Sequence, residues 1–446
     1  AGRNFKGLSP FTSERTPSFV VSPEKQIWHD FSSSKGGDVF SFVMLVEGIE
    51  CRQALEQLAR RAGVDLSMYQ SGHSGEIAKK KKRLLEATRL ACHYFQQNML
   101  KNSSALEYIF KQRSLSKEVV SNFKIGYAPA AGDALVRVLE QRGFTKQELS
   151  AAGLTNRFGG DLFRGRMMVP LMDSAGQVIG FTARIIEDDP GAPKYLNTPQ
   201  TLLYDKSRHV FGLSQAKEAI RTAGYSVVVE GNLDVVSSHQ VGITQVVATA
   251  GTALTEYHLK ALARLSPQVR LAFDGDKAGV AASERAISIA QQVGVELTIV
   301  SLPDDAKDPD ELIQQDPALW QAAIDGAMPA VDWLLAHYGR REDLTTAAGK
   351  RAYSSSAMQL IRALPDQVEQ DHYLQIMAEK TGASLEALRA KLQDVAVAVE
   401  APSKKIAPQV VVPEEPAAVH EHDVLAAQTP ADAARGARRR PGCAPR

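Results

Sequence analysis

Carboxylates follow two apolar segments of the chain, and their positions suit the binding of a metal ion. Glu230 comes directly after the run Val227 to Val229, and Asp274 and Asp276 end the segment "VRLAFDGD". Acids at the carboxyl ends of parallel strands point into the crevice where such sheets bind ligands. Two carboxylates at positions i and i+2 share a face and repel unless a cation lies between them. Oxygen ligands without His or Cys favour Mg²⁺ or Mn²⁺.

Further acids extend this candidate metal site. Asp234 lies one helical turn after Glu230, close enough to share the same crevice. Asp308 and Asp310, in the segment "DPDEL", follow the last apolar segment and could add a third pair of carboxylates. The same segment is also a good start for a helix, with an early proline and acids in the first turn. For Asp308 and Asp310, helix capping and metal binding therefore remain alternatives.

The elements that must position these acids alternate between strands and helices. The strands are predicted at "YSVVVE", "ITQVVATA", "QVRLAFD" and "VELTIVSL", with amphipathic segments between them. This alternation predicts a parallel sheet with helices on both faces. Upstream, residues 160–213 alternate like strands around "MMVPLMDSAGQVIGFTARII", and "DSAG" is a hairpin turn between two apolar runs.

The rest of the chain divides by composition. Short strands and a helix interrupted at Gly48 are expected at the start, and a polar Ser/Gly linker follows. The basic run "KKKKR" opens a long helical stretch and is interpreted as a solvated helix face rather than a nucleic-acid contact. The last segment contains no aromatic residue and is expected to be disordered. The predicted boundaries are 1–66, 67–78, 79–224, 225–310, 311–396 and 397–446.

Composition excludes several classes of protein. Of the 446 residues, 44% are apolar and 23% are charged, which is typical of a globular protein. No apolar run is long enough to cross a bilayer. The first segment, "AGRNFKGLSPF", has no apolar core of a signal peptide, so a cytoplasmic location is expected. Cys51, Cys92 and Cys443 are far apart and give no disulfide framework. The net charge is +1, so any contact with nucleic acid would come from local patches. The absence of an initial Met suggests that the chain begins inside a longer gene product.

Two blocks of motifs resemble the bacterial DNA primase family. "VVVEGNLDVV", "ATAGTALTEYHL", "LAFDGDKAG" and "DPDEL" resemble its TOPRIM domain, which also occurs in type IA topoisomerases, nucleases and recombination mediators. "FRGRMMVPLMDSAGQVIGFTARII" and "PKYLNTPQTLLYDKSRHVFGL" resemble the basic subdomain that precedes TOPRIM in primases. The resemblance covers residues 5 to about 395. It implies a multidomain α/β and α+β fold with a zinc-ribbon-like N-terminal module, a basic α+β subdomain, a parallel TOPRIM sheet and a C-terminal helical subdomain.

The resemblance also implies an activity and the residues that carry it. The expected enzyme is a DNA-dependent RNA polymerase that makes short primers on a single-stranded DNA template from ribonucleoside triphosphates. It implies metal binding by Asp274 and Asp276, further metal contacts from Asp308 and Asp310, and Glu230 as a metal ligand, general base or organiser of the site. The residues implied to contact nucleotide or template are Arg164, Arg166, Arg184, Lys194, Tyr195, Asn197, Lys206 and Asp234.

Two other functions remain open on the sequence alone. One is a non-catalytic TOPRIM protein that binds single-stranded DNA as a scaffold. The other is a TOPRIM nuclease, which would cut DNA instead of making RNA. The converging acids argue against the scaffold, because unpaired carboxylates at one rim are of no use without a cation.

The N-terminal segment resembles the family's zinc ribbon in outline but has none of its cysteines. The four ligand positions of that pattern fall on Ser9, Thr12, Asp30 and Ser33. Structural zinc takes Cys or His, so a ribbon without zinc is expected. Its core would consist of aromatic side chains instead, namely Phe11, Phe19, Trp28, Phe31, Phe40 and Phe42.

The C-terminal helices raise the question of a helicase partner. Primases of this family usually end in a domain that binds the replicative helicase. Residues 330–396 resemble the helical end of the catalytic core, and little structured sequence is expected after them. The helicase-binding domain is therefore expected to be missing from this chain.

Overall fold

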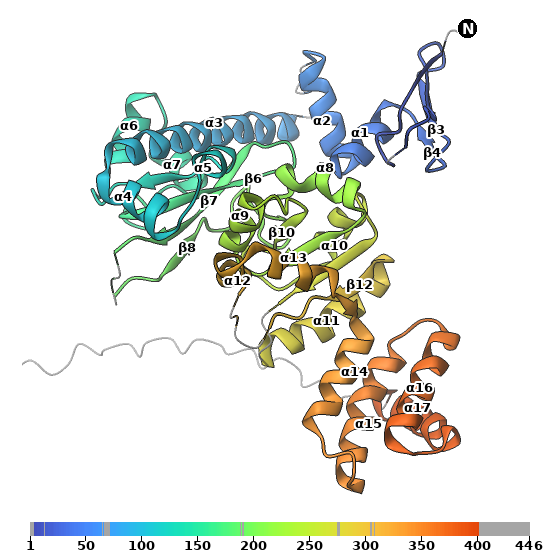
Figure 1. The fold of residues 1–446 in the computed structure, drawn as a ribbon. Helices are drawn as coiled ribbons and strands as arrows, with labels where there is room; N and C mark the ends of the chain where they lie inside the picture. Colours follow the sequence, from blue (N-terminus) through green and yellow to red (C-terminus); the bar gives the residue numbers. More distant parts are fainter. Residues whose placement is uncertain are drawn as a thin grey trace, which may run out of the picture. The chain divides into compact units, whose positions relative to one another are not determined.

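The computed structural model describes most of the chain up to Glu400. The described residues are 4–12, 14–64, 66, 72–187, 189, 191–273, 277–303, 306 and 308–400. Residues 1–396 form one compact unit, and its described part contains three β-sheets (Figure 1). Asp274 and Asp276 lie outside the described residues, as does the predicted tail beyond Glu400.

The N-terminal module is a small antiparallel sheet followed by two helices. Its strands pair in the order β1-β2-β3-β4, and α1 ends at Gly48, whose φ of 67° lies in the left-handed region. This helix break is the one that the sequence predicts. The bounds are β1 Phe5–Gly7, β2 Phe19–Ser22, β3 Ile27–Asp30, β4 Lys35–Gly37, α1 Val39–Glu47 and α2 Cys51–Arg61.

Aromatic rings fill the interior of this module, as predicted, but not all six contribute. Phe11, Phe19, Trp28 and Phe42 form one cluster, with ring centroids 5.2–6.3 Å apart. Phe31 is 67% exposed and contacts His29 instead. The difference follows from strand geometry, because Phe31 comes after the end of β3, beyond the packed face.

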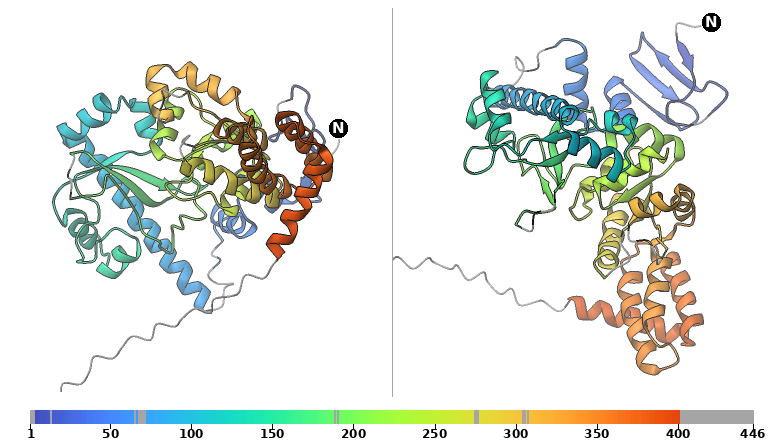
Figure 2. Two further views of the ribbon diagram at one scale, coloured as in Figure 1. Left: turned by 90° about the horizontal axis from the view of Figure 1, so that it is seen from below. Right: turned by 60° about the vertical axis from the view of Figure 1, so that its left-hand side comes forward.

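The second part of the chain is an antiparallel sheet covered by helices. Its strands pair in the order β5-β6-β7-β8, and Figure 2 shows the long helix α3 running along this sheet. The helix begins at Gly72, earlier than the predicted start near residue 79. The bounds are α3 Gly72–Lys101, α4 Ser103–Glu107, the π-helical turn η2 Tyr108–Gln112, α5 Lys117–Asn122, β5 Gly126–Ala128, α6 Ala134–Gln141, α7 Lys146–Ala151, β6 Arg166–Met172, β7 Val178–Ile185 and β8 Tyr195–Asn197.

The turn between β6 and β7 is the predicted "DSAG" hairpin. The Asp173 carboxylate accepts hydrogen bonds from the backbone N–H groups of Ala175 and Gln177, at 3.0 and 2.9 Å. Gly176 has a φ of 76°, which favours glycine at this position. The hairpin holds β6 and β7 in register, so Arg166 lies opposite Ile185 at the far end of the pair.

The third part is the predicted parallel sheet. Its strand order is β10-β9-β11-β12-β13, in which the first four strands are parallel and β13 is antiparallel. The bounds are α8 Leu213–Ala223, β9 Ser226–Val229, α9 Asn232–Gln240, β10 Val246–Ala248, α10 Glu256–Ala263, β11 Gln268–Ala272, α11 Lys277–Val293, β12 Glu296–Ile299, α12 Pro309–Gln315, α13 Pro317–Asp325 and β13 Met328–Pro329.

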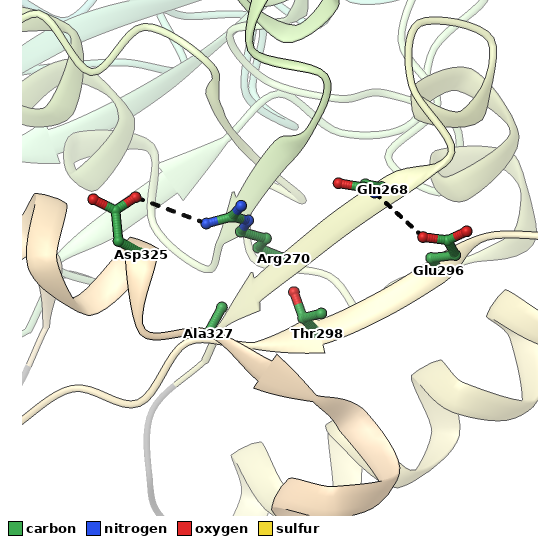
Figure 3. Close-up of a pocket in the computed structure, with 6 residues that line it drawn as sticks. All are labelled: Gln268, Arg270, Glu296, Thr298, Asp325 and Ala327. Carbon is green, nitrogen blue, oxygen red and sulfur yellow. Dashed lines mark hydrogen bonds and ion pairs between the residues drawn. The ribbon is translucent and has the colours of Figure 1, made fainter.

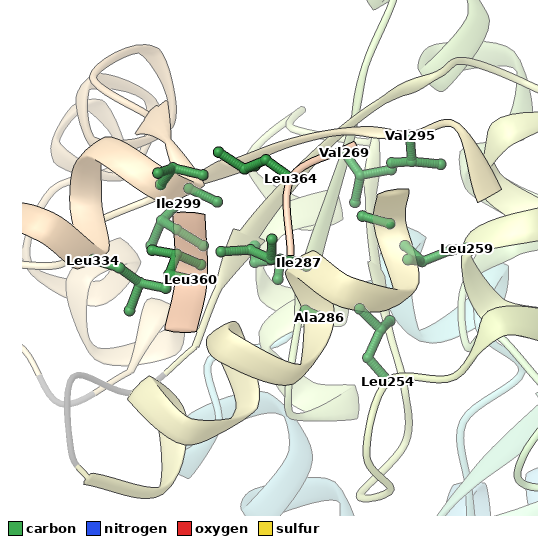
Figure 4. Close-up of a cluster of buried hydrophobic side chains, with 14 of the residues drawn as sticks. Leu254, Leu259, Val269, Ala286, Ile287, Val295, Ile299, Leu334, Leu360 and Leu364 are labelled. Atoms are coloured by element: carbon green, nitrogen blue, oxygen red, sulfur yellow. The ribbon is translucent and has the colours of Figure 1, made fainter. Parts of the chain in front are cut away.

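Alternate side chains of this sheet enter two different cores. Val228 belongs to a core shared with the C-terminal helices, whereas Val227 and Val229 belong to a core shared with the preceding subdomain. Figure 4 shows the first of these cores, in which Ile299 of β12 lies with Leu334 and Leu360 of the helical subdomain. The period of two residues along a strand explains how one sheet connects its neighbours on both faces.

The C-terminal part is helical, as predicted. Its helices are α14 Ala330–Arg341, α15 Ala347–Arg362, α16 Gln367–Thr381 and α17 Leu385–Glu400. Within the described ranges, no helix combines the length and the hydropathy needed to cross a membrane.

The contact between β5 and α3 leaves no room for a side chain at Gly126. A Cβ atom at this position would lie 2.6 Å from the backbone carbon of Phe95 and 2.8 Å from the nitrogen of Gln96. Because both neighbours are helix backbone, we expect Gly126→Ala to lower the free energy of unfolding by roughly 1–3 kcal/mol. Urea unfolding measures this. Gly7→Ala is the control, since a Cβ at Gly7 meets nothing within 4 Å. Equal stabilities of the two variants would contradict the packing described.

Candidate active site

The acids of the parallel sheet lie where the strand order reverses. From β9, the chain leads first to β10 on one side and later to β11 on the other. In such sheets, ligands bind at the carboxyl ends of the strands at this point. Glu230 directly follows β9 and is exposed there. Asp274 and Asp276 directly follow β11 in sequence, although they lie outside the described residues.

Asp234 and Asp310 meet at this edge of the sheet. The Asp234 carboxylate accepts a hydrogen bond from the backbone N–H of Gly231 at 3.1 Å and one from that of Asp310 at 3.3 Å. Gly231 is required for this contact, because a Cβ on it would lie 2.5 Å from a carboxylate oxygen of Asp234. The structure thus places Asp234 with Asp310, in the crevice that its position one helical turn after Glu230 predicts, although the resemblance implies a nucleotide contact for it.

Asp308 has the capping role that the sequence leaves as an alternative. It is the N-cap of α12, and its carboxylate accepts the backbone N–H of Glu311 at 2.9 Å. A carboxylate keeps further lone pairs when it caps a helix, so this bond leaves metal binding by Asp308 open. Asp308 and Asp310 both act on the charge of Asp234. Asp234 and Asp310 are therefore in direct contact, and the charge of Asp308 acts on Asp234 as well.

The pKa of Asp234 is raised to about 7. Burial of the carboxyl group is the largest cause, and the negative charges of Asp308 and Asp310 add to it. The hydrogen bonds from the backbone of Asp310 and Gly231 act in the opposite direction but do not outweigh burial. Burial and like charges both disfavour the ionised form of Asp234. A cation bound at this edge would stabilise that form.

Two residues that the sequence analysis missed hold Asp310. The Ser237 hydroxyl donates a hydrogen bond to one of its carboxylate oxygens, and the Arg113 guanidinium lies 3.4 Å from the other. Arg113 and Asp310 are largely buried, with side chains 16% and 17% exposed. No spacing rule connects positions so far apart in the chain, so only the fold reveals this pair.

The predicted basic residues gather at one end of the antiparallel sheet. Arg166 begins β6 and is 4% exposed, and its guanidinium donates to the backbone oxygen of Lys194 at 3.3 Å. Burial lowers the pKa of Arg166. Arg184, near the end of β7, donates to the hydroxyl of Tyr195 and lies over its ring, 5.2 Å from the centroid.

A series of contacting side chains connects this basic end of the sheet to the acids. Burial acts to lower the pKa of Arg184, but hydrogen bonds with the Tyr195 and Tyr108 hydroxyls hold it above its ordinary value. Tyr108 in turn accepts a hydrogen bond from Arg113 Nε at 3.4 Å. Because Arg113 also pairs with Asp310, the contacts run from Tyr195 through two arginines and a second tyrosine to the acids of the parallel sheet.

Asn197 and Lys206 lie on segments that border the parallel sheet. The Asn197 side chain lies 4.0 Å from the position of a Cβ on Gly251, in the turn after β10. Lys206 is exposed, and its backbone oxygen is bonded by His258 Nε2 at 3.2 Å, which ties this loop to α10. The remaining member of the predicted set, Arg164, is exposed just before β6.

The donors at the acidic edge are of the type that a hard divalent cation takes. Asp234, Asp308 and Asp310 offer only oxygen, which is the donor that Mg²⁺ and Mn²⁺ prefer. The buried side-chain oxygen of Asn232 has no hydrogen-bond partner and adds another acceptor at the start of α9. Among the described residues, no three His, Cys, Asp or Glu side chains come close enough to hold a metal by themselves.

A cavity of about 140 Å³ on the parallel sheet is a different feature. Gln268 and Glu296, which line it, begin β11 and β12, so it lies toward the amino ends of the strands (Figure 3). Four of its polar side chains form two pairs: Gln268 donates to Glu296 at 3.3 Å, and Arg270 lies 4.0 Å from Asp325. The buried Thr298 hydroxyl has no hydrogen-bond partner in the described part of the chain. The acids follow the opposite ends of the strands, so this cavity is not the candidate active site.

Four family models match the chain in order. Residues 1–74 match the CHC2 zinc finger, residues 94–217 the N-terminal domain of the DNA primase catalytic core, residues 227–313 the Toprim-like family, and residues 331–386 the DnaB-helicase binding domain of primase. Together these matches span all three sheets and the first C-terminal helices.

Curated proteins similar to this chain are named DNA primase. The chain is 36% identical to a DNA primase of Geobacillus stearothermophilus over 403 residues, which is 88% of this chain and 66% of that protein. It is 33% identical to a DNA primase of Listeria monocytogenes over 407 residues, 88% of this chain and 64% of that protein. The chain thus spans slightly less than two thirds of these relatives.

Solved structures agree with the fold. The Aquifex aeolicus primase, comprising zinc binding and RNA polymerase domains, is 32% identical with a TM-score of 0.60, covering 87% of this chain and 93% of that one. A DnaG primase catalytic domain bound to single-stranded DNA is 34% identical with a TM-score of 0.60, covering 68% of this chain and 98% of that one.

The prediction that zinc is absent is wrong, because residues 1–74 match a zinc-finger family. It rested on the donors alone, which do depart from the Cys and His of structural zinc sites. Asp30 is fully buried and accepts hydrogen bonds from the hydroxyls of Ser9 and Ser33, while Thr12 Oγ1 lies 2.6 Å from Ser32 Oγ. These side chains offer oxygen atoms only, whereas structural zinc is usually bound by Cys sulfur and His nitrogen. The proposed catalytic steps do not involve zinc.

The prediction that the helicase-binding domain is missing is also wrong. Residues 331–386, which form most of α14, α15 and α16, match the DnaB-helicase binding domain of primase. The error arose because the helices that pack against the parallel sheet were taken to be only the end of the catalytic core. The same helices can complete the catalytic core and bind a helicase, because their apolar side packs in the core shared with the parallel sheet and their other side faces outward.

The unusual pKa of Asp234 predicts a pH dependence of stability. In the folded protein this pKa is about 7, against an ordinary value of 3.8. The stabilising contribution of the protonated group is therefore complete below about pH 4 and lost as the pH rises through about 7. Urea unfolding in EDTA at about pH 5 and about pH 8 should show a larger loss for the wild type than for Asp234→Asn. The same loss in both proteins would contradict the burial of an ionisable group at this position.

The matched family models and the relatives named DNA primase identify which family that contains a TOPRIM domain includes this chain. The two solved primases share the fold over 87% and 68% of this chain. The chain belongs to the bacterial DnaG-type DNA primases.

Proposed function

We propose that this chain is a DNA primase, a DNA-dependent RNA polymerase that makes short RNA primers on single-stranded DNA. Its role would be in bacterial DNA replication, in the cytoplasm. Its family membership supports this activity, and so do the relatives named DNA primase, of which the chain spans 66% and 64%. The observation that carries the proposal is the series of contacts from Tyr195 to Asp310, because it connects the end proposed to bind phosphate with the edge proposed to bind metal.

The acidic edge would hold the cations of nucleotidyl transfer. The proposed ligands are Asp274 and Asp276, with Asp308 and Asp310 as further ones, and Glu230 as a ligand or general base. The chemistry supplied by bound Mg²⁺ is activation of the attacking 3′-hydroxyl and neutralisation of the departing pyrophosphate. Arg113 and Ser237 orient Asp310, so that its carboxylate is already in place before nucleotides arrive.

The basic end would hold the triphosphate and the template. Arg166 and Arg184 have fixed guanidinium groups, which suit paired contacts to phosphate oxygens. Exposed Lys194, Lys206 and Arg164 supply mobile or peripheral positive charge. Tyr195 and Asn197 remain proposed contacts to the nucleotide, by stacking and by hydrogen bonding respectively.

We also propose the domain boundaries of the sequence analysis. They are 1–66 for the ribbon, 67–78 for the linker, 79–224 for the basic subdomain, 225–310 for TOPRIM, 311–396 for the helical subdomain and 397–446 for the tail. Residues 72–78 of the proposed linker are already part of α3. Limited proteolysis with mass spectrometry would test them, because cleavage concentrates in exposed, weakly packed segments.

A helicase of the DnaB type is the proposed protein partner. The match of residues 331–386 to a helicase-binding domain supports this. Val368 on α16 lies inside the matched range and is 78% exposed, which makes it a candidate contact. Val368→Asp should weaken retention of the chain by an immobilised DnaB-type helicase, whereas Val64→Asp, outside the matched range and 46% exposed, should not. Equal retention of both variants would argue against a contact at α16.

Primer synthesis on single-stranded DNA with ribonucleoside triphosphates and Mg²⁺ tests the proposed activity. Asp276→Asn should abolish RNA synthesis, because it removes a charged oxygen ligand, while affinity for single-stranded DNA stays near that of the wild type. Asp325→Asn is the matched control, since Asp325 lies by the cavity at the amino ends of the strands.

Other results would overturn the proposal. RNA synthesis by Asp276→Asn at a rate comparable to the wild type would refute the metal assignment. No RNA from the wild type, with DNA binding intact, would favour the scaffold alternative, and cut DNA would favour the nuclease.

A further inference from the structure

A short hairpin just before β6 presents an arginine and a phenylalanine to solvent. Residues 155–161 form this hairpin, which we call the 155–161 hairpin, with a bridge between Thr155 and Asp161. Phe158 at its tip is 82% exposed, which is the highest exposure among the large apolar side chains described. The Arg157 guanidinium lies over the Phe158 ring, 4.7 Å from the centroid.

The tip of the hairpin is rigid, despite its exposure. The Asn156 side chain accepts the backbone N–H of Phe158 at 2.8 Å and that of Gly160 at 3.3 Å, and it donates to the oxygen of Asp161 at 3.2 Å. The backbone adds two more bonds, from Asn156 to Gly160 and from Gly159 to Asn156. An aromatic ring on a fully bonded turn loses little conformational freedom when it binds a partner.

The base of the hairpin is fixed to the subdomain. Asp161 is 3% exposed, and its carboxylate accepts the first backbone N–H groups of α6, those of Leu135 and Val136, at 2.9 and 3.0 Å. Its own N–H donates to Gly132 at 2.8 Å. The hairpin therefore cannot fold back to cover the Phe158 ring without uncapping a helix.

The hairpin leads directly to the basic end of the antiparallel sheet. Arg164 follows it, and a guanidinium nitrogen of Arg164 lies 3.9 Å from the position of a Cβ on Gly132, the residue that anchors the hairpin. Two residues later Arg166 begins β6. Arg184 and Tyr195 at this sheet end form a second arginine and aromatic pair, at 5.2 Å.

The positive charge here is not neutralised by neighbours. Within the part of the chain that the structure describes, neither Arg157 nor Arg164 forms an ion pair with a carboxylate. Sites for single-stranded nucleic acid combine such unpaired cations with exposed aromatic rings on which bases stack. A docking surface for an apolar protein partner would instead need a contiguous apolar patch, and Phe158 is a single ring beside an arginine.

We propose that Phe158 is a stacking position for an unpaired base of the single-stranded template, with Arg157 contacting the adjacent phosphate. The inference rests on the proposed function, because it extends the template path from the basic sheet end along the 155–161 hairpin. Sequence pattern gives no hint of it, since one phenylalanine in a polar loop has no periodicity.

The test is the binding of fluorescent oligothymidylate to wild type, Phe158→Ala and Phe158→Trp at several salt concentrations. Phe158→Ala should weaken binding by about 5-fold to 150-fold, and Phe158→Trp should restore it. The dependence on salt should stay unchanged in Phe158→Ala, because no phosphate contact is lost. Arg157→Gln should instead lower the salt slope by about 0.7. Thermal unfolding of Phe158→Ala should match the wild type, since the ring is 82% exposed.

An oligonucleotide with abasic sites separates stacking from indirect effects. On this probe, wild type and Phe158→Ala should bind with equal affinity, because there is no base to stack. A loss by Phe158→Ala that is equal on both probes, or no loss on either, would overturn the inference. Failure of the proposed function would give a different result from failure of this inference. If the proposed function is wrong, the wild type makes no primers, and Arg164→Ala binds both oligonucleotides as tightly as the wild type.

Discussion

The burial of the Asp234 carboxyl group beside two other acids, at one edge of the parallel sheet, is the constraint on which the candidate site depends. Burial and two neighbouring acids raise the pKa of Asp234 to about 7, which shows how strongly this edge disfavours negative charge. The fold keeps the acids together by backbone bonds to Asp234, a cap at Asp308 and an ion pair at Asp310. A cation bound at this edge would be attracted by these carboxylates and would reduce the repulsion among them.

The same constraint explains why two sheets are joined. Arg113 comes from the helical segment before β5, yet it neutralises an acid of the parallel sheet. Through Tyr108 it connects to Arg184 at the basic end of β6–β8. The apolar core under these contacts is also shared, with Val227 and Val229 packing among side chains of the preceding subdomain. Asp310 and Arg184 are therefore held by one connected set of side chains.

Much of this arrangement could be predicted from the sequence. Strand-end acids and the alternation of strands and helices predicted the parallel sheet, because both signals are local. Arg113 and Ser237 could not be predicted, since their role depends on contacts across 197 and 73 positions of the chain. The errors on zinc and on the helicase-binding segment came from judging residue types and chain position alone. A module can keep its family's fold after its side chains have diverged.

A crystal structure with single-stranded DNA, Mn²⁺ and a non-hydrolysable ribonucleoside triphosphate would locate the proposed cation and nucleotide. We expect an anomalous peak about 2.1 Å from carboxylate oxygens that follow β9 and β11, with the triphosphate between this peak and Arg166 or Arg184. Manganese bound elsewhere, or a triphosphate remote from the basic end of β6–β8, would contradict this expectation.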